Sequence, residues 1–134
     1  MALHYGADAV YLAGTQFGMR ASAGNFNEEQ LREAVQLAHS MGRRVYVTCN
    51  TLPREDELAA LPKYLEFLQD VEADALIIAD IGVLELAKKY APKVAKHIST
   101  QFGVINSAAA NALYAFGADT VVLARETPLE DIRK

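Results

Sequence analysis

Three copies of one short pattern occur in the sequence, each between a predicted helix and a predicted strand. The copies are Gly6-Ala7-Asp8-Ala9-Val10, Glu72-Ala73-Asp74-Ala75-Leu76 and Gly117-Ala118-Asp119-Thr120-Val121. Short apolar runs predict five strands, at residues 9–13, 45–49, 75–79, 97–99 and 120–124. The strands begin roughly 20–35 residues apart, the period of a βα unit, which forces parallel pairing with right-handed crossovers. The sequence therefore predicts an α/β fold with a parallel sheet.

Helices between these strands are predicted from their caps and from apolar residues at helical spacing. Asn27 and Gln30 form a capping-box pattern in front of an amphipathic stretch. Pro62 lies inside the next amphipathic stretch and should kink that helix or divide it in two. Asn106 is the expected N-cap of a later helix, and Thr127, followed by proline, is the expected N-cap of the last one.

The continuous apolar strands indicate that both faces of the sheet are covered. We expect a partial TIM-like (β/α)8 barrel with five strands present, and the alternative is a five-stranded doubly wound sheet. Residues 1–134 are expected to form a single α/β domain that is truncated at both ends, because the chain starts and stops within a helical turn. A partial barrel leaves two edge strands unpaired, so we expect a homo-oligomer or pairing with segments of a longer parent protein.

Charge and cysteine content exclude several classes of protein. The 134 residues carry a net charge of −4, and the Lys and Arg residues are scattered, so this chain alone lacks the basic stripe of a nucleic-acid binder. Any RNA contact would need a basic surface from the full-length protein. One cysteine cannot form an internal disulfide, and neither a membrane-length apolar run nor a signal peptide is present. A cytoplasmic protein without a membrane partner is expected.

Polar residues follow the predicted strands, and the carboxyl ends of parallel strands form the rim where α/β proteins bind ligands. The expected substrate-binding residues on this rim are Asn50, Asp80, Gln101, Arg125 and Glu126. Arg125 suits a carboxylate or a phosphate because its guanidinium donates two hydrogen bonds at once. Asn50 and Gln101 are suited to reading an amide or a base edge. The alternative is that Arg125 and Glu126 only pair with their neighbours.

Two further parts of the rim are open to two interpretations. The polar loop at 14–24 contains Phe17 and Arg20, an aromatic ring and a cation that could meet a base, so Arg20 joins the expected substrate-binding residues. The alternative is an ordinary rim loop. Thr48 and Ser99 belong to the rim or, alternatively, fill polar layers inside the barrel.

No complete catalytic group can be assigned from the sequence. Cys49 is expected to be a buried structural residue, because an active thiolate needs a nearby base or cation. Ser99 likewise lacks a base, since His97 is expected to begin its strand and to lie at the opposite rim. Asp80 with Glu126 makes no zinc pattern, and one cysteine cannot hold a cluster, so no cofactor is expected in this segment.

Several segments, in this order along the chain, resemble peptidase family U32, the collagenase-like proteins. They are Tyr5-Gly6-Ala7-Asp8-Ala9-Val10-Tyr11-Leu12, Ala21-Ser22-Ala23-Gly24-Asn25-Phe26, Arg44-Val45-Tyr46-Val47-Thr48, His97-Ile98-Ser99-Thr100-Gln101 and Val122-Leu123-Ala124-Arg125-Glu126. Together they cover nearly the whole chain.

The resemblance implies an N-terminal barrel whose first strand is absent here. It also implies a downstream group of four cysteines, absent from this chain, that holds an iron–sulfur cluster in the full-length parent. Members of the family were first described as proteases, and others act in tRNA or rRNA pyrimidine hydroxylation or as accessory proteins in ubiquinone hydroxylation. We therefore expect a fragment of such an enzyme that is inactive alone. The alternative is a non-catalytic domain that binds a small anion or a partner protein.

Overall fold

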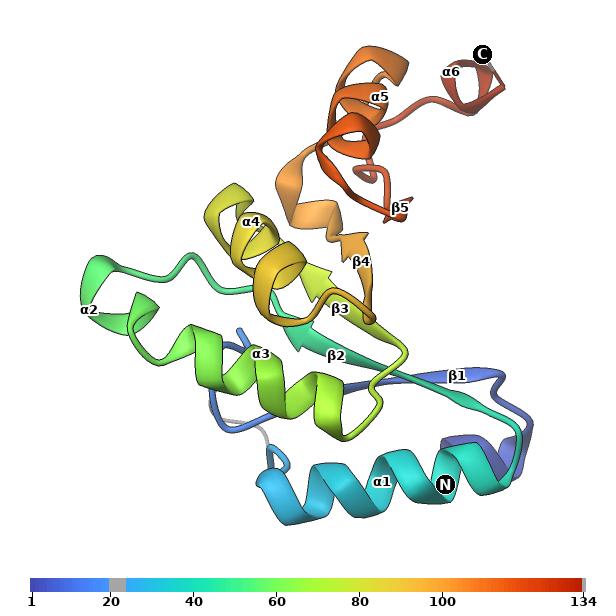
Figure 1. The fold of residues 1–134 in the computed structure, drawn as a ribbon. Helices are drawn as coiled ribbons and strands as arrows, with labels where there is room; N and C mark the ends of the chain where they lie inside the picture. Colours follow the sequence, from blue (N-terminus) through green and yellow to red (C-terminus); the bar gives the residue numbers. More distant parts are fainter. Residues whose placement is uncertain (20–23, 134) are drawn as a thin grey trace.

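The computed structural model describes residues 1–19 and 24–133, and it alternates strands with helices along the chain (Figure 1). The elements are η1 (Ala2–Tyr5), β1 (Ala9–Ala13), α1 (Glu28–Ser40), β2 (Arg44–Cys49), α2 (Glu55–Leu58), α3 (Leu61–Asp70), β3 (Ala75–Ile78), α4 (Ile81–Tyr90), β4 (Ala95–Ile98), η2 (Thr100–Phe102), α5 (Ser107–Phe116), β5 (Thr120–Val121) and α6 (Leu129–Ile132).

The described strands form one parallel sheet in the order β1-β2-β3-β4-β5. Figure 1 shows them following one another from the blue end of the chain to the red end. A doubly wound sheet requires the strand order to reverse at a switch point, whereas a barrel adds each strand beside the preceding one. The sequential order therefore confirms the barrel-type prediction and removes the doubly wound alternative. The edges of this sheet are β1 and β5.

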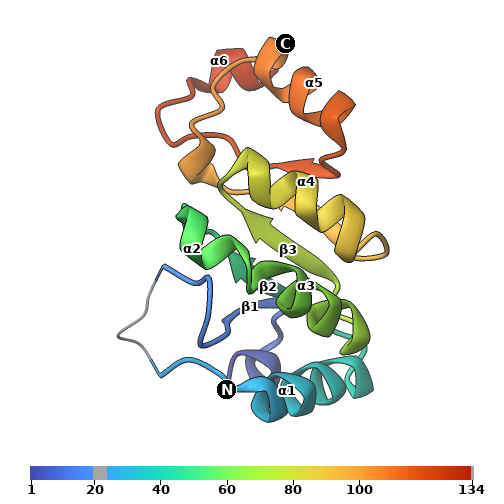
Figure 2. The ribbon, with the colours of Figure 1, turned by 60° about the vertical axis from the view of Figure 1, so that its left-hand side comes forward.

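The core lies between the sheet and its helices. In β2 the side chains alternate, with Val45, Val47 and Cys49 fully buried and Tyr46 and Thr48 partly exposed. The buried set packs against leucines of α1, α3 and α4, and Figure 2 shows α3 and α4 running in front of β2 and β3. The prediction that both faces are covered holds for β3, which is buried throughout, and is wrong for β2. The reason is that helices pack against only one face of β2, where Val45, Val47 and Cys49 are buried.

The opposite face carries a row of rings. The rings of Tyr11 and Tyr46 meet edge to face at 5.5 Å, and those of Tyr46 and His97 at 5.0 Å. The expectation that His97 begins its strand is wrong, because β4 starts at Ala95. The predicted strand at 97–99 leaves Lys96 outside it. Its stem is nevertheless buried, and its Nζ donates to the Pro92 carbonyl at 3.0 Å.

Local capping chemistry positions most helices as expected. Asn27 and Gln30 form the capping box of α1, and the Asn106 side chain accepts from the backbone N–H of Ala109 at the start of α5. Pro62 stands in the first turn of α3, so the amphipathic stretch is divided into α2 and α3. The proline is tolerated there because first-turn N–H groups have no partner within the helix.

Predictions for the end of the chain are wrong in two details. The last strand is limited to Thr120–Val121, because beyond it the backbone N–H of Ala124 turns away to the Val104 carbonyl. Thr127 does not cap the last helix. Its hydroxyl donates to the Ala124 carbonyl at 2.8 Å, and the helix begins at Leu129. The short turn η2 after β4 was not predicted.

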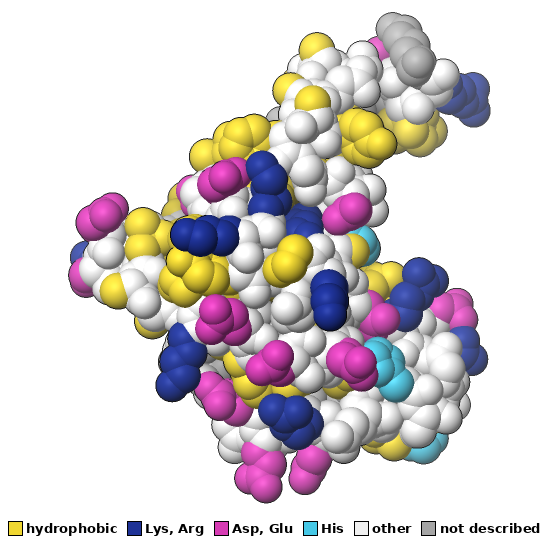
Figure 3. Space-filling view, viewed as in Figure 1, with side chains coloured by type: hydrophobic (Ala, Val, Ile, Leu, Met, Phe, Trp, Pro, Cys, Tyr) yellow, Lys and Arg dark blue, Asp and Glu magenta, His cyan; other side chains and the backbone are white. Residues whose placement is uncertain are grey.

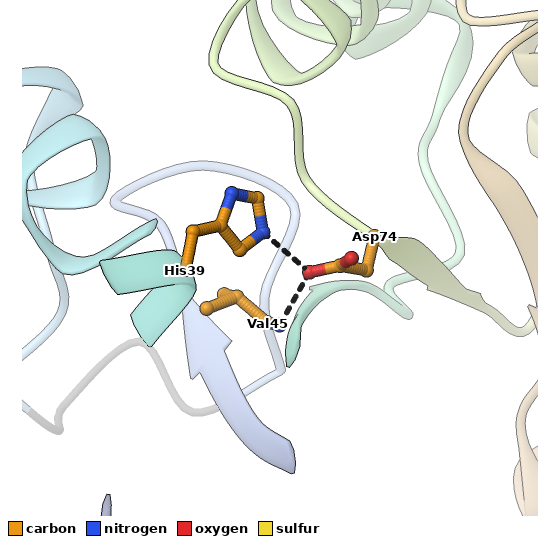
Figure 4. Close-up of polar contacts among 3 residues, drawn as sticks. All are labelled: His39, Val45 and Asp74. Atoms are coloured by element: carbon orange, nitrogen blue, oxygen red, sulfur yellow. Dashed lines mark hydrogen bonds and ion pairs between the residues drawn. The ribbon is translucent and has the colours of Figure 1, made fainter. Parts of the chain in front are cut away.

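The repeated Ala-Asp turn has a clear structural role at the N-terminal ends of the strands. Asp74 accepts from the backbone N–H of Val45 at 2.7 Å and from His39 Nε2 at 2.9 Å (Figure 4). Asp119 accepts from the backbone N–H of Lys96 at 2.8 Å. Each of these two carboxylates therefore attaches the start of one strand to the start of the preceding strand in the sheet.

The remaining copy of the turn uses its carboxylate differently. Asp8 precedes the edge strand β1 and pairs with the Arg43 guanidinium beside the start of β2. The residue two positions before the aspartate has positive φ in all three copies, at 91° for Gly6, 60° for Glu72 and 110° for Gly117. That conformation is unfavourable for glutamate and easily adopted by glycine.

Candidate functional site

A cavity of about 630 Å³ lies at the carboxyl ends of β1, β2 and β4. Its described lining residues are Tyr11, Leu12, Ala13, Met19, Gly24, Asn25, Phe26, Thr48, Asn50, Ile77, Ser99, Thr100, Gln101 and Arg125. The lining thus combines two aromatic residues, several residues with hydroxyl or amide groups and one arginine. This is the size and composition of an ordinary small-molecule site.

Two amide side chains form the polar centre of the lining. Asn50 directly follows β2, and Gln101 lies in the short turn η2 after β4. Asn50 Nδ2 donates to Gln101 Oε1 at 2.7 Å. The same oxygen accepts from Ser99 Oγ at 3.2 Å, and the backbone N–H of Met19 donates to Asn50 Oδ1 at 3.3 Å. Residues far apart in the sequence therefore hold each other in one orientation.

Arg125 contributes the positive charge. It follows the buried Ala124, whose backbone N–H donates to the Val104 carbonyl at 2.8 Å and so fixes the direction of the chain. Within residues 1–19 and 24–133, the guanidinium has no carboxylate or hydrogen-bond partner. Its five N–H donors are therefore available to an anion at the cavity.

The structure brings three of the six expected substrate-binding residues together at this cavity, namely Asn50, Gln101 and Arg125. Asp80 instead caps α4, where its carboxylate accepts from the backbone N–H of Val83 at 2.9 Å. Glu126 is exposed and is not part of the lining. Arg20 lies outside the described residues. The alternative, in which Arg125 and Glu126 only pair with their neighbours, is not seen, because neither side chain forms an ion pair within the described residues.

The rim loop contributes other residues than those expected. Phe17 points into the core, where its ring lies 5.5 Å from that of Tyr64, and its backbone N–Cα torsion is positive at 58°. Met19 and Asn25 line the cavity in its place. Tyr11 also lines it, although an apolar strand pattern gave no reason to single it out. Its position on the face without helices is decided by strand pairing.

Thr48 and Ser99 line the cavity, and the Thr48 hydroxyl and the Ser99 residue are also buried, so each shows features of both the rim interpretation and the polar-layer interpretation. Thr48 Oγ1 is buried and has no hydrogen-bond partner among the described residues, although the residue lines the cavity. Ser99 is buried and acts as a positioning group, because its hydroxyl also accepts from the backbone N–H of Gln101 at 3.3 Å.

The nucleophile candidates are not activated. Cys49 is fully buried on the helix-facing side of β2, and this burial raises the pKa of its thiol to about 12. Ser99 Oγ donates to Gln101, and in the described part of the chain no histidine contacts Ser99 or Cys49. A peptidase nucleophile needs a base within hydrogen-bond reach. The described residues therefore contain no nucleophile–base pair.

The residues that the structure describes contain no ligand set for an iron–sulfur cluster or another metal centre. Clusters are held by several thiolates, and Cys49 is the one cysteine of the sequence. In residues 1–19 and 24–133 there is also no group of three or more His, Cys, Asp or Glu side chains arranged to hold a metal ion. None of the helices in the same ranges is long and apolar enough to cross a membrane.

A sequential parallel sheet with a polar cavity at its carboxyl ends is the architecture of α/β proteins of the barrel type. Within that class the family is shown by sequence: the model of peptidase family U32 matches residues 1–134, and the chain belongs to this family.

Relatives and solved structures agree with this assignment. The chain is 39% identical over 134 residues to tRNA hydroxylation protein P1 of Bacillus subtilis, covering 100% of this chain and 32% of the relative. It is 39% identical to a 23S rRNA 5-hydroxycytidine synthase of Escherichia coli, over 98% of this chain and 20% of the relative. An uncharacterized protease of Methanocaldococcus jannaschii is 38% identical, over 99% of this chain and 32% of that protein. The chain thus spans about a third or less of the length of these curated relatives.

Among solved structures, a U32 peptidase superposes with a TM-score of 0.70 at 21% identity, covering 88% of this chain and 51% of the other. A 3-hexulose-6-phosphate synthase superposes with a TM-score of 0.68 at 17% identity, covering 98% of this chain and 62% of the other. At these identities the two structures support the fold alone.

Proposed function

We propose that this chain is the substrate-binding part of a protein that acts in the hydroxylation of an RNA pyrimidine. The observation that carries the proposal is the cavity in which the Asn50–Gln101 amide pair and the unpaired Arg125 guanidinium face the same volume. Amides suit the polar edge of a base, and a guanidinium suits a phosphate. The names of the relatives, which include tRNA and rRNA hydroxylation proteins, support the same choice.

In this proposal the chain binds and orients the nucleotide but does not carry out the oxidation. We assign the redox centre, an iron–sulfur cluster in the family resemblance, to segments of the full-length protein outside this chain. The segment alone is then inactive. Most of the RNA contact also belongs to the full-length protein, because acidic and basic side chains are interspersed on the face shown in Figure 3 and the net charge is −4. We propose the cytoplasm as the place of this action.

Peptide hydrolysis is not supported by the described geometry, despite the name of the family. Cys49 is buried with a raised pKa, and the Ser99 hydroxyl is used to position Gln101. A second candidate function is supported by Arg125 itself: a non-catalytic domain that binds a small anion would use the same free guanidinium. Self-association through the edges β1 and β5 stays a prediction.

The test is mass spectrometry of modified nucleosides from a strain that lacks the parent gene. We expect 5-hydroxypyrimidines to disappear from tRNA or rRNA and to return when the full-length gene is restored. A gene carrying Asn50→Ala with Gln101→Ala should restore less than about a tenth of the modification, since the loss of two hydrogen bonds amounts to roughly tenfold or more in binding. Unchanged nucleosides in the deletion strain would contradict the proposal and favour the anion-binding domain.

A further inference from the structure

We propose that the Asn50–Gln101 amide pair binds a pyrimidine through its C2 carbonyl, so that the site accepts uracil and cytosine alike and leaves C5 facing away from the pair. This inference rests on the proposed function, because it names the part of the substrate that the same cavity recognises.

Hydrogen bonds to the pair determine which of its atoms remain available. The backbone N–H of Met19 donates to Asn50 Oδ1, which turns Asn50 Nδ2 toward Gln101. Gln101 Oε1 accepts from Asn50 Nδ2 and from Ser99 Oγ, so both of its lone pairs are used. Gln101 Nε2 consequently points the other way and contacts Met19 Sδ.

After these contacts each amide nitrogen keeps one N–H. Gln101 Oε1 has no lone pair left, whereas Asn50 Oδ1 accepts only from Met19 and keeps one, so among the described residues the pair offers a ligand two N–H donors and one acceptor. Arg125, on the same cavity, only donates. N–H donors therefore outnumber acceptors around the amide pair, which favours a ligand group that accepts hydrogen bonds.

Pyrimidines meet this requirement at one shared atom. Uracil and cytosine differ at position 4, where one carries a carbonyl and the other an amino group, but both carry an oxygen at C2 with two lone pairs. The two N–H groups of the pair match the two lone pairs of that oxygen, whereas the amino group of cytosine would meet one acceptor of the pair, the remaining lone pair of Asn50 Oδ1. Because C5 lies across the ring from C2, a base held by its C2 carbonyl turns C5 away from the pair.

The other lining groups suit the remainder of a nucleotide. Tyr11 is 62% exposed and lines the cavity, so its ring offers a face on which a base can stack. Arg125 provides the donors for a phosphate. Adenine has no carbonyl group, and each of its acceptor nitrogens has a single lone pair, so one such nitrogen can accept from only one of the two N–H groups of the amide pair.

The test measures nucleotide binding to the full-length protein by calorimetry, using UMP, CMP, AMP and 2-thio-UMP. We expect UMP and CMP to bind within about threefold of each other and AMP at least about tenfold more weakly, the ratio that one lost hydrogen bond accounts for. Replacing the C2 oxygen by sulfur, a weaker acceptor, should also weaken binding. Gln101→Glu should lower the affinity for UMP and CMP about tenfold or more, because it exchanges a donor for an acceptor.

Gln36→Glu is the matched control, since it adds the same charge at an exposed position of α1 away from the cavity. It should bind UMP like the unsubstituted protein. The inference is overturned if UMP fails to bind at millimolar concentration, if AMP binds as well as UMP, if CMP and UMP differ by more than about thirtyfold, or if Gln101→Glu changes nothing.

The same Gln101→Glu gene, placed in the deletion strain, separates the two proposals. If the deletion abolishes 5-hydroxypyrimidines and Gln101→Glu restores them fully, this inference fails while the proposed function stands. If the deletion has no effect on these nucleosides, the proposed function fails whatever the binding data show.

Discussion

The two ends of the parallel sheet use their polar side chains in opposite ways. At the N-terminal ends, Asp74 and Asp119 accept from backbone N–H groups of the neighbouring strands, and Asp8 pairs with Arg43. At the carboxyl ends, the amides of Asn50 and Gln101 restrain each other and still keep free N–H groups. Polar groups whose bonds are all made within the chain stabilise it, while polar groups held in place with donors to spare can bind a ligand.

The largest effect on stability is expected at the N-terminal end. Asp74→Ala removes the acceptor of the Val45 backbone N–H and the partner of His39, and it should lower the free energy of unfolding by about 2–3 kcal/mol. Asp74→Asn should cost about half as much. Urea unfolding measures both. The control is Asp70→Ala, which replaces an exposed residue at the end of α3. If Asp70→Ala and Asp74→Ala are equally stable, the carboxylates at the N-terminal ends of the strands do not have the stabilising role assigned to them here.

A packing effect of about 2 kcal/mol is expected just after β1. A Cβ atom on Gly14 would lie 2.1 Å from Tyr64 Oη, so Gly14→Ala should destabilise the chain. Tyr64→Phe alone should be neutral or slightly stabilising, because that hydroxyl is buried without a partner among the described residues. In the double variant Gly14→Ala/Tyr64→Phe, the second substitution should recover most of the stability that Gly14→Ala loses. Gly24→Ala is the matched control, because a Cβ there meets no described atom within 4 Å. If the double variant is as unstable as Gly14→Ala alone, a contact other than the Tyr64 hydroxyl causes the destabilisation.

Arg125→Ala should separate binding from stability. The guanidinium has no partner in the described structure, so unfolding should change by less than about 0.5 kcal/mol. UMP affinity should fall at least about tenfold, and Arg125→Lys should recover only part of it, since a lysine lacks the bidentate fork. Arg133→Ala, exposed and away from the cavity, should leave both unchanged. A loss of stability without a loss of affinity would make Arg125 a structural residue like Asp74.

The smallest effect concerns the one copy of the repeated turn that has no glycine. Glu72→Gly should stabilise the chain by about 0.5 kcal/mol, because φ at this residue is 60°. Glu66→Gly, in the middle of α3, should have the opposite sign and cost about 1 kcal/mol. Thermal unfolding compares the two, and destabilisation by both substitutions would mean that the Glu72 side chain contributes more than its backbone strain costs.

Local chemistry made much of the fold and part of the site predictable. Asn27 and Asn106 cap their helices as expected, and Pro62 separates α2 from α3, because each effect depends on groups within a few residues. Asn50 and Gln101 were expected at the carboxyl rim because parallel strands bring their ends together. His97 was placed wrongly, since the burial of Lys96 that allows β4 to begin at Ala95 depends on distant packing.

By itself the sequence determined the βα repeat, the parallel pairing that follows from it, and the chemical types at the strand ends. Only the tertiary structure decided that the strands add in sequential order, that Asp80 caps a helix while Asn50 faces the cavity, and that Gln101 bonds to Asn50. The physical reason is the range of the interactions. Caps and turns are made by neighbours in the chain, but which donors remain free depends on hydrogen bonds between residues 31 to 82 positions apart.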